Sequence, residues 1–396
     1  MKILFISTRV PLPSTSGDTL IIYNRLARMS KGHDISLVMF YRKKKELEVL
    51  KDLEEFCEDI WPIKISRFDG FINLIKNLFV SMDPVQAMYY DSKLVKNQVH
   101  SIVNDNEFDL INSFLIRTIP IIKDLNSNIV LDMIDSMQLN FSNRLKNSKS
   151  ILKSQFYKFE YERLVKFESK IPSNVKKAIF VSERDSCITQ INSSVVPLGV
   201  NTDIFFPSAV QRKCIIFSGN MSYEPNIQAV IWFVENCLER ILEVVNDVQF
   251  IIAGKDPHHQ IKKMSSKNII VTGYVDSIAE LLSTSSVSVA PMISGSGMQN
   301  KVLEGMSCGV PVVTTPYGVG DIKVRHMKEV IIAEEPEIFS EFVIDILLSP
   351  EKYKSLSSNA REYVKKNNSW ESHCNAVDKI YRLAAKSHKQ SLIASI

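Results

Sequence analysis

The sequence lacks long apolar runs and lacks the cysteine spacing of a metal site or a disulfide framework. No stretch reaches the ~18 consecutive apolar residues that a membrane-spanning helix needs. The apolar start, Met1–Ile6, runs into Ser7-Thr8-Arg9 without the small-residue cleavage site of a secretory signal. The six cysteines are scattered, with no Cys-x-x-Cys pair and no histidine at ligand spacing. These absences exclude a disulfide-stapled secreted protein, and they predict a cytoplasmic protein without a structural metal.

A strong excess of one charge sign is also absent. Lys and Arg together number 48 and Asp and Glu 44, a net charge of +4, which is too weak to indicate nucleic-acid binding. The small basic excess lies in the first half of the chain. It fits an anionic substrate or an anionic membrane surface, and equally an ordinary solvated surface.

What the sequence has is enough apolar material for several cores. Its 396 residues are 45% hydrophobic and 23% charged. At ~150 residues per domain, this length predicts two or three domains. Composition therefore predicts an ordinary globular chain rather than a disordered or fibrous one.

Short β-branched runs recur along the chain, and each is followed by a longer helical pattern. The runs are Lys2–Ser7, Asp34–Phe40, Leu110–Phe114, Asn128–Asp132, Ala178–Ser182, Cys214–Gly219, Val248–Gly254, Asn268–Gly273, Val287–Pro291, Val310–Thr315 and Val330–Ala333. They are apolar on consecutive residues, as in parallel strands buried on both faces. Strand–helix alternation repeated twice predicts an α/β fold with two doubly wound, Rossmann-like domains.

The boundary between the two domains is expected near residue 200. Val196–Asn201 reads as a strand end and turn, and Pro207 follows in a linker. We therefore expect one domain over residues 1–200 and a second over 201–369. Residues 370–396 show a helical pattern with no later strand, and are expected to pack back on the first domain.

Two amphipathic stretches stand out in the first half. Arg144–Lys170 is rich in basic residues with interleaved apolar side chains, and Ile63–Met82 combines phenylalanine and aliphatic residues with Lys64, Arg67 and Lys76. Both fit peripheral contact with an anionic bilayer. The favoured interpretation is that they are helices whose apolar faces pack on the domain's own sheet.

The segment Ala290–Thr315 carries the clearest chemical signal. It parses as strand, glycine loop, helix, glycine stop and strand, with Gly295 and Gly297 where the helix is expected to begin. The free N–H groups of a helix start attract an anion, above all a phosphate. Lys301 is expected one turn into this helix, and Glu304 about two turns past Gly297, where a carboxylate can accept hydrogen bonds from sugar hydroxyls. A purely structural loop remains the alternative.

Four separated segments, in the correct order, resemble one family. Gly297-Met298, Lys301–Met306 and Gly309–Thr315 are similar to the nucleotide-sugar signature of the retaining glycosyltransferases of family 4, which have the GT-B fold. The resemblance extends to three further places: Lys2–Ile6 with Pro11–Asp18, Val196–Phe205, and Ile216–Asn226. The last of these is similar to a subgroup that acts in surface-polysaccharide assembly. The resemblance implies two Rossmann-like domains facing a cleft, a nucleoside diphosphate sugar as donor, and no cofactor or metal.

The family's donor-site positions transfer in part. Glu304 matches the carboxylate that holds the ribose hydroxyls, and Gly297 and Met298 match positions facing the diphosphate. The family's other glutamate falls at Ser296, and the Arg/Lys pair after the first strand of the second domain is missing from the loop beginning Gly219-Asn220. The resemblance therefore assigns diphosphate neutralisation to Lys301, to the helix terminus, or to a basic residue of the first domain.

In the first domain, candidate residues follow the strands. Gly17 lets the backbone approach a ligand, while Asp18 either caps a helix or binds a hydroxyl, and Arg9 is expected to point toward the substrate. Arg117 binds substrate or pairs with a surface acid. Asp135 resembles an acceptor-side acid of the subgroup, with a helix cap as the alternative. Together with Lys301, Arg117 and Asp135 are the candidate catalytic residues.

The predicted function is retaining transfer of a sugar from a nucleoside diphosphate sugar, UDP favoured over GDP, to a hydroxyl acceptor. The acceptor class is a glycan, a lipid-linked sugar or a small molecule, with cell-surface polysaccharide as the expected product. Peripheral contact with the inner face of a membrane is compatible with this function; a nucleic-acid partner is not expected. Two alternatives stay open: an inactive GT-B scaffold subunit, favoured by the missing glutamate and Arg/Lys pair, and a GT-B sugar-nucleotide epimerase.

Overall fold

The structure is a computed structural model of the chain. It describes residues 1–12, 17–78, 81–146, 148, 150–189, 191–210, 212–294 and 299–393, with side chains as far as residue 386. The chain divides into two compact units. The first unit comprises Met1–Pro197 together with Cys374–Ile396, and the second is Leu198–His373.

The first unit is built on a parallel sheet whose order in space is β3-β2-β1-β4-β5-β6-β7. Its strands are β1 (Lys2–Ser7), β2 (Asp34–Tyr41), β3 (Asp59–Lys64), β4 (Leu110–Phe114), β5 (Ile129–Ile134), β6 (Val175–Phe180) and β7 (Ser193–Val195). The order reverses between β1 and β4, which pair directly, with Ile3 opposite Leu110 and Ile6 opposite Ser113. This is the topological switch point of a doubly wound sheet.

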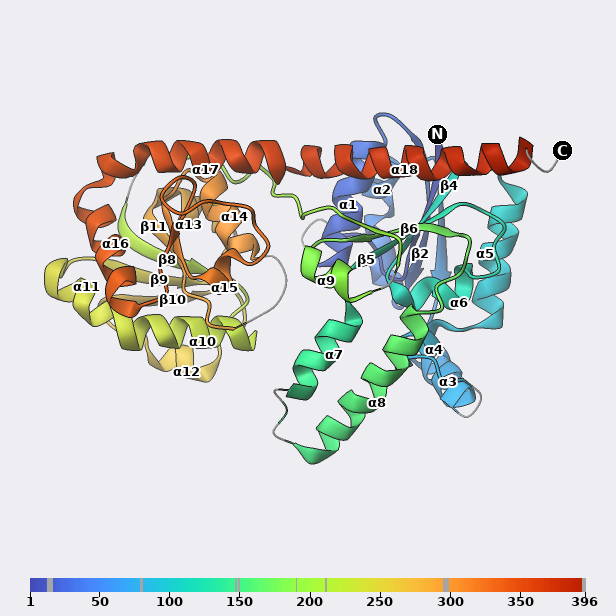
Figure 1. Cartoon of the computed structure of the whole chain (residues 1–396), viewed down its shortest axis with the longest axis horizontal. Helices are drawn as coiled ribbons and strands as arrows, with labels where there is room; N and C mark the ends of the chain where they lie inside the picture. Colours follow the sequence, from blue (N-terminus) through green and yellow to red (C-terminus); the bar gives the residue numbers. More distant parts are fainter. Residues whose placement is uncertain are drawn as a thin grey trace. The chain divides into compact units, whose positions relative to one another are not determined.

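Helices connect these strands and cover both faces (Figure 1). They are α1 (Asp18–Met29), η1 (Lys44–Val49), α2 (Leu50–Glu54), α3 (Arg67–Leu78), α4 (Val85–Tyr90), α5 (Lys93–Asp105), η2 (Ile116–Thr118), α6 (Ile119–Ile122), α7 (Met137–Lys146), α8 (Ile151–Glu168) and α9 (Glu183–Ile188). Because side chains alternate along a strand, β1 serves both faces. Leu4 and Ile6 join the core with α4, α5 and α6, whereas Phe5 packs on Phe114 and on Tyr381.

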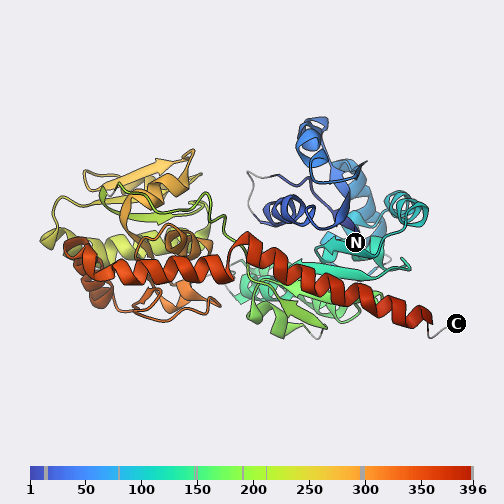
Figure 2. The ribbon, with the colours of Figure 1, turned by 90° about the horizontal axis from the view of Figure 1, so that it is seen from above.

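Tyr381 belongs to α18 (Trp370–Ile393), the last helix of the chain. The part of α18 that follows Cys374 belongs to the first unit and crosses the strands of its sheet in Figure 2. Asp378, on the same helix, accepts a hydrogen bond at 2.8 Å from His33 Nε2. This half of α18 thus covers a sheet face that would otherwise leave Phe5 exposed.

The second unit repeats the architecture with the sheet order β10-β9-β8-β11-β12-β13, again parallel. Its strands are β8 (Arg212–Ser218), β9 (Gln249–Ala253), β10 (Ile269–Gly273), β11 (Ser285–Ala290), β12 (Val312–Thr314) and β13 (Ile331–Ile332). Its helices are α10 (Glu224–Phe233), η3 (Val234–Leu238), α11 (Glu239–Val244), α12 (His259–Lys263), α13 (Ile278–Thr284), α14 (Asn300–Ser307), α15 (Pro316–Val319), α16 (Pro336–Leu348), η4 (Pro350–Tyr353), α17 (Lys354–Asn367) and the start of α18. The switch point lies between β8 and β11.

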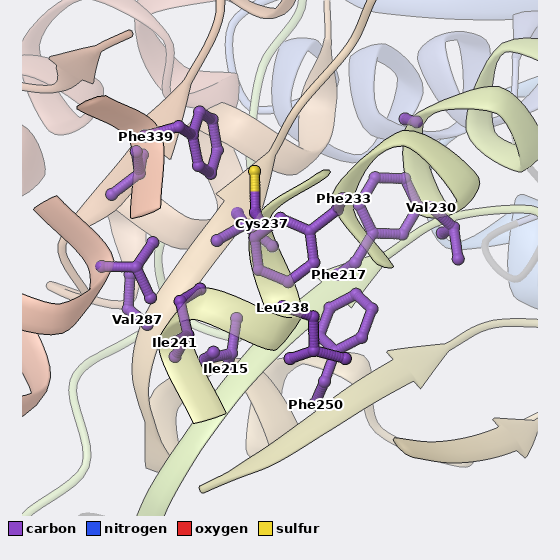
Figure 3. Packing of buried hydrophobic residues seen from close by; sticks show 14 of the residues in the cluster. Ile215, Phe217, Val230, Phe233, Cys237, Leu238, Ile241, Phe250, Val287 and Phe339 are labelled. Atoms are coloured by element: carbon purple, nitrogen blue, oxygen red, sulfur yellow. The ribbon is translucent and has the colours of Figure 1, made fainter. Parts of the chain in front are cut away.

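An aromatic core holds the helices on one face of this second sheet. Phe233 of α10 packs against Phe250 of β9 and Phe339 of α16, with ring centroids 4.7 and 5.9 Å apart. Figure 3 shows these rings gathered around Ile215 and Phe217 of β8. All five side chains are buried, and fixed packing of this kind sets the position of the loops that leave the strands.

The predicted α/β class with two parallel, Rossmann-like sheets is confirmed. Two strands were missed. β3 contains Pro62, which cannot donate a ladder hydrogen bond, and pairs only with β2 at the sheet edge. β7 is a three-residue edge strand with two serines. Edge strands carry little of the continuous apolar signal that marks a buried strand.

The favoured interpretation of the amphipathic stretches was wrong for part of each helix. α8 buries Leu164 and α3 packs on α4, but Leu152, Phe156 and Phe68 are exposed. Both helices extend beyond the sheet at the end of the unit away from α18 (Figure 1). Beyond the sheet, α8 packs on α7, where the Phe156 and Phe141 ring centroids lie 6.5 Å apart, but this contact leaves Leu152 and much of Phe156 exposed. No described helix combines the length and apolar character needed to cross a bilayer.

Candidate functional site

In each unit the candidate residues follow strands at the switch point of the sheet. Open α/β sheets bind ligands outside the carboxyl ends of these strands. In the second unit, Gly219 and Asn220 follow β8, while Lys301 and Glu304 lie on α14, which follows β11. In the first unit, Arg9 and Asp18 follow β1 and Arg117 follows β4.

Helix α14 sits close against its sheet because Gly305 has no side chain. A Cβ on Gly305 would lie 3.0 Å from Val312 Cγ2 and 3.1 Å from Ser288 Oγ. Val302, Leu303 and Met306 are fully buried on the same helix. This packing fixes Lys301 and Glu304, one turn apart, on the part of α14 that remains partly accessible.

Lys301 and Glu304 are ionisable groups in a poorly solvated place. Burial lowers the pKa of Lys301 to about 8, and the charge of Glu304 acts in the opposite sense. Burial raises the pKa of Glu304 to about 7. Lys301 Nζ donates to Gln299 Oε1 at 2.9 Å and lies 5.5 Å from the centre of the Phe217 ring. Within the described part of the chain, the Glu304 carboxylate has no hydrogen-bond donor. Strongly shifted pairs of this kind are typical of functional sites.

The loop after β8 brings backbone and an amide next to Lys301. Gly219 has a φ of 155°, and a Cβ there would lie 2.8 Å from Asn226 Nδ2 and 3.5 Å from Lys301 Cε. Asn226 is buried, donates to Asn220 O at 2.9 Å, and leaves its Oδ1 without a partner. Gly254, after β9, is equally constrained, since a Cβ there would meet Gly219 O at 1.7 Å. Glycine is therefore required at both strand ends for this close packing.

The predicted helix start was wrong by a few residues. α14 begins at Asn300, after Gln299 in an extended conformation, so Lys301 lies in the first turn and Glu304 in the next. Gly295 and the predicted donor-site residues Ser296, Gly297 and Met298 lie outside the described residues. Their assigned contacts with the diphosphate stay predictions.

In the first unit Asp18 joins two arginines. Its Oδ1 accepts from Arg9 Nη1 at 3.0 Å and its Oδ2 from Arg117 Nη2 at 2.9 Å. Arg117 Nε also donates to Thr8 Oγ1 at 2.6 Å, and its guanidinium lies 5.6 Å from the Tyr90 ring centre. Burial lowers the pKa of Arg117.

The capping interpretation of Asp18 was wrong. The residue preceding α1 is Gly17, with φ 78°, and Asp18 is the first residue of the helix, its carboxylate paired with the two arginines. Arg117 likewise pairs with a nearly buried acid rather than with a surface acid. Arg9 remains half exposed and so stays available to an anionic ligand.

Strained backbone marks the ends of β4 and β5 beside this cluster. Leu115 has a φ of 71° and Ile134 a φ of 65°, a region that costs a branched or bulky residue energy. Hydrogen bonds to neighbouring strands hold both: Leu115 N donates to Asp132 O at 2.7 Å, and Ile134 O accepts from Val181 N at 2.8 Å. Such strain persists only where surrounding structure imposes it, and it aims the following side chains.

Asp135, directly after Ile134, belongs to a group of carboxylates. Burial raises its pKa to about 6, with Asp185 and Asp18 adding to the shift. Glu168 of α8 is buried, accepts from Gln138 Nε2 at 2.6 Å and has a pKa raised to about 7, again chiefly by burial. Asp185 accepts from Ser136 N at 2.8 Å, which ties α9 to the start of α7. Asp135 therefore lies near other poorly solvated carboxylates, and the start of α7 is capped instead by Ser136, whose Oγ accepts from Leu139 N at 3.3 Å.

Sequence reasoning missed the residues that support these side chains. Asn226 and Gln299, beside Lys301, lie within segments that carried a signal but were not named as site residues. Gln138, which holds Glu168 thirty residues away, belongs to no motif. Asp185 had a local signal, since Ser182 and Asp185 have the spacing of an N-cap pair and do form one. Among the described residues no group of three or more His, Cys, Asp or Glu side chains could hold a metal ion.

Comparison with known proteins identifies a family that the second unit resembles. Residues 212–349, which make up most of the second unit, match the family "Glycosyl transferases group 1". A Klebsiella pneumoniae protein described as an uncharacterized 44.6 kDa protein in the cps region is 22% identical over 392 residues, covering 92% of this chain and 96% of that protein.

Solved structures resemble the whole chain. Sucrose-phosphate synthase from Thermosynechococcus elongatus superposes with a TM-score of 0.68 at 13% identity, covering 98% of this chain and all of that one. HepE from Anabaena, solved in complex with UDP, gives a TM-score of 0.65 at 13% identity, covering 96% of this chain and 99% of that one. HepE has also been solved with UDP-glucose. These likenesses show the GT-B fold for the chain as a whole.

Proposed function

We propose that this protein, a glycosyltransferase with the GT-B fold, transfers a sugar from a nucleoside diphosphate sugar to a hydroxyl acceptor and keeps the anomeric configuration. The observation that carries the proposal is the Lys301–Glu304 pair, held on α14 beside the Gly219 loop at the switch point of the second sheet. A cation and a carboxylate in a poorly solvated place suit a ligand with both phosphates and hydroxyls. The resemblance to the retaining transferases of family 4 supports the stereochemical part.

Glu304 is the residue that binds the donor's ribose. Its carboxylate is desolvated and has no donor among the described side chains, so vicinal hydroxyls would supply the hydrogen bonds that it lacks. Hydrogen bonds to the ionised form would lower the raised pKa of Glu304 again. Binding of the nucleoside is thereby coupled to ionisation of this carboxyl group.

Lys301 replaces the cations that are missing from the loop after β8. That loop carries neither Arg nor Lys between Gly219 and Glu224. Lys301 reaches the same place from α14, since its Cε lies 3.5 Å from where a Gly219 Cβ would stand. A fixed ammonium group stabilises the negative charge that grows on the diphosphate as the glycosidic bond breaks. Ser296, Gly297 and Met298 would add backbone N–H groups at the same phosphates.

The first unit binds the acceptor through Arg9, Asp18 and Asp135. Arg117 holds Asp18 in place and is a positioning residue for it. In a retaining reaction of this kind the departing phosphate takes the acceptor proton, so no dedicated base is required. Asp135, with a pKa near 6, is mostly ionised at neutral pH and is suited to orient an acceptor hydroxyl.

UDP is the proposed nucleotide, because HepE, a structural neighbour, is solved with UDP and with UDP-glucose. The proposed product is a cell-surface polysaccharide, supported by the Klebsiella pneumoniae relative described from a cps region. The proposed place of action is the cytoplasm; all six cysteines are free and five of them are buried, as suits a reducing compartment.

A thermal-shift series with UDP, GDP, ADP and their sugar conjugates tests the donor site. A ligand at about a hundred times its dissociation constant stabilises the folded state by roughly 2.7 kcal/mol. We expect a clear shift with UDP and UDP-sugars, lost in Glu304→Ala and kept in Glu341→Ala. Glu341 is the matched control, an exposed glutamate of the second unit in a surface pair with Arg240.

Chromatographic detection of sugar transfer then separates a transferase from its competitors. Anomeric configuration in the isolated product, read by NMR coupling constants, tests retention. An inactive scaffold would give no shift with any nucleotide, while an epimerase would convert the UDP-sugar without an acceptor. Either result would reject the transferase proposal.

A further inference from the structure

An apolar stripe runs along the free half of α8. Leu152, Phe156 and Phe159 recur at helical spacing, and their side chains are 80%, 48% and 44% exposed. Ile151, at the start of the helix, is 78% exposed. Large apolar side chains left in water over successive turns mark an interaction surface rather than a core.

A second stripe lies on α3. Phe68, Phe71 and Ile75 follow the same kind of spacing and are also exposed. α3 packs on α4, and α4 is tied to α8 because Val85 N donates to Glu160 Oε2 at 3.0 Å. α3 and α8 project from the same end of the first unit (Figure 1). The two stripes therefore belong to one end of one rigidly linked group of helices.

The exposed charges around the α8 stripe are almost all basic. Between residues 144 and 170 the exposed basic side chains of the described chain are Arg144, Lys146, Lys153, Lys158, Lys166 and Lys170. Of the acids in this range only Glu162 is exposed. Glu160 and Glu168 are buried, the first beside Arg163 and the second on Gln138. Burial of these acids removes them from the surface, and the face that remains is strongly positive.

Helix geometry places cations on both sides of the stripe. At 3.6 residues per turn, Lys153 lies about 100° to one side of Leu152, and Lys158 about 100° to the other side of Phe159. Long lysine side chains in this position can reach phosphate groups while the apolar residues between them enter the acyl region.

We propose that the outer ends of α7 and α8, together with α3, dock on an anionic lipid bilayer. An apolar stripe flanked by lysines fits the headgroup–acyl boundary of such a bilayer, and two apolar helices give a firmer contact than one. A second copy of this chain fits poorly, because two such basic faces repel each other. Helices α7 and α8 form a hairpin, and its end opposite the exposed stripe carries Asp135 and the Gln138–Glu168 contact. Docking would therefore bring a membrane-borne acceptor close to the proposed acceptor residues. This last consequence rests on the proposed function; the docking itself does not.

Vesicle flotation with the full-length protein tests the docking. We expect binding to phosphatidylcholine vesicles containing about a third phosphatidylglycerol, at least tenfold weaker binding to pure phosphatidylcholine, and weakening by salt. L152S/F156S and K153E/K158E are each expected to reduce binding to the anionic vesicles at least fivefold. Matched controls lie in the second unit: V244S/Y274S removes exposed apolar side chains, and K262E/K263E reverses exposed lysines of α12.

Three results would overturn the proposal. The first is equal binding by wild type, stripe variants and controls, and the second is no vesicle binding at all. The third is a wild-type dimer in size-exclusion chromatography that L152S/F156S converts to a monomer, which would assign the stripe to a second copy. UDP thermal shifts of the same variants keep the two proposals apart. Lost vesicle binding with an unchanged UDP shift concerns the membrane surface alone, and vesicle binding without any nucleotide shift would reject only the transferase.

Discussion

Lys301 and Glu304 are opposite charges one helical turn apart, yet each pKa has shifted in the direction that favours the uncharged form. The pKa of Lys301 is lowered and that of Glu304 is raised. A tight ion pair would raise the pKa of the lysine and lower that of the glutamate. Desolvation therefore outweighs their attraction, and the Lys301 ammonium donates instead to Gln299. The two charges are held near each other without cancelling, which leaves both able to meet a ligand.

The affinity for a UDP-sugar should pass through a maximum between about pH 7 and pH 8. Ionised Glu304 accepts hydroxyl hydrogen bonds, so affinity falls as pH drops through about 7. Protonated Lys301 attracts the diphosphate, so affinity also falls as pH rises through about 8. Isothermal titration with an intact UDP-sugar, whose diphosphate does not titrate in this range, measures both limbs.

Conservative variants assign the limbs. Glu304→Gln should remove the acid limb, and Lys301→Arg should remove the alkaline limb because arginine stays charged.

Stability offers an independent check on Glu304. Its raised pKa means that its contribution to stability is complete below the ordinary value of 4.5 and is lost as pH rises through about 7. If urea midpoints of wild type and Glu304→Gln shift in parallel over this range, Glu304 is not desolvated as described.

At the scale of elements, the position of α14 depends on the absence of one methyl group. Gly305→Ala should force the helix away from Val312 and Ser288, lowering stability by ~1–3 kcal/mol and weakening UDP binding. Gly32→Ala is the control, because nothing lies within 4 Å of a Cβ there. Urea denaturation and calorimetric titration measure the two effects, and unchanged UDP affinity in a destabilised Gly305→Ala protein would separate α14 packing from the donor site.

A buried ion pair fastens α1 to β5 in the first unit. Arg25 hydrogen bonds to Asp132, and both side chains are essentially inaccessible to water. Asp132→Ala leaves a buried, uncompensated guanidinium and should cost ~3–5 kcal/mol. Asp247→Ala breaks the exposed pair with Lys213 and should move the urea midpoint far less, because solvent screens that pair. Equal urea midpoints for the two variants would contradict this account.

The sequence predicted interior elements better than edges and overhangs. Strands such as β1 and β8 are buried on both faces, so their apolar runs are continuous and unambiguous. β3, with Pro62, and the short β7 lie at sheet edges, where composition is less constrained. The apolar pattern of α8 correctly predicted a helix. It could not say which turns lie over the sheet, because periodicity describes a face and not what covers it.

The candidate site shows the same division. Glu304, Lys301 and Gly219 were predictable because they belong to a contiguous motif and to a strand end. Gln138 was not, since it reaches Glu168 through the fold and shares no local pattern with it. For Asp18 only the capping alternative was wrong, and its pairing with Arg9 and Arg117 was not predicted because the three residues are brought together by the fold.

At the scale of the whole molecule, the proposed donor residues Gly219, Lys301 and Glu304 all lie in the second unit. Hydrogen exchange of the full chain with and without UDP should therefore slow most at residues 219–226 and 299–304. Residues 135–140 and 182–188 of the first unit should change much less with UDP alone. If UDP instead protects mainly the first unit, the nucleotide binds there and not beside α14, and the assignment of Glu304 to the donor site is rejected.

The first unit is completed by the part of α18 that follows the second unit in the chain. Phe5 and the face of β1 around it precede the second unit, whereas Tyr381 is synthesised only after it. During translation the second unit can finish folding while the first still waits with an apolar sheet face open to water. A nascent chain that stalls after residue 373 would thus carry one folded unit and one incomplete unit with an exposed apolar surface that is prone to aggregate. Chaperones would therefore be needed most before the remainder of α18 is synthesised.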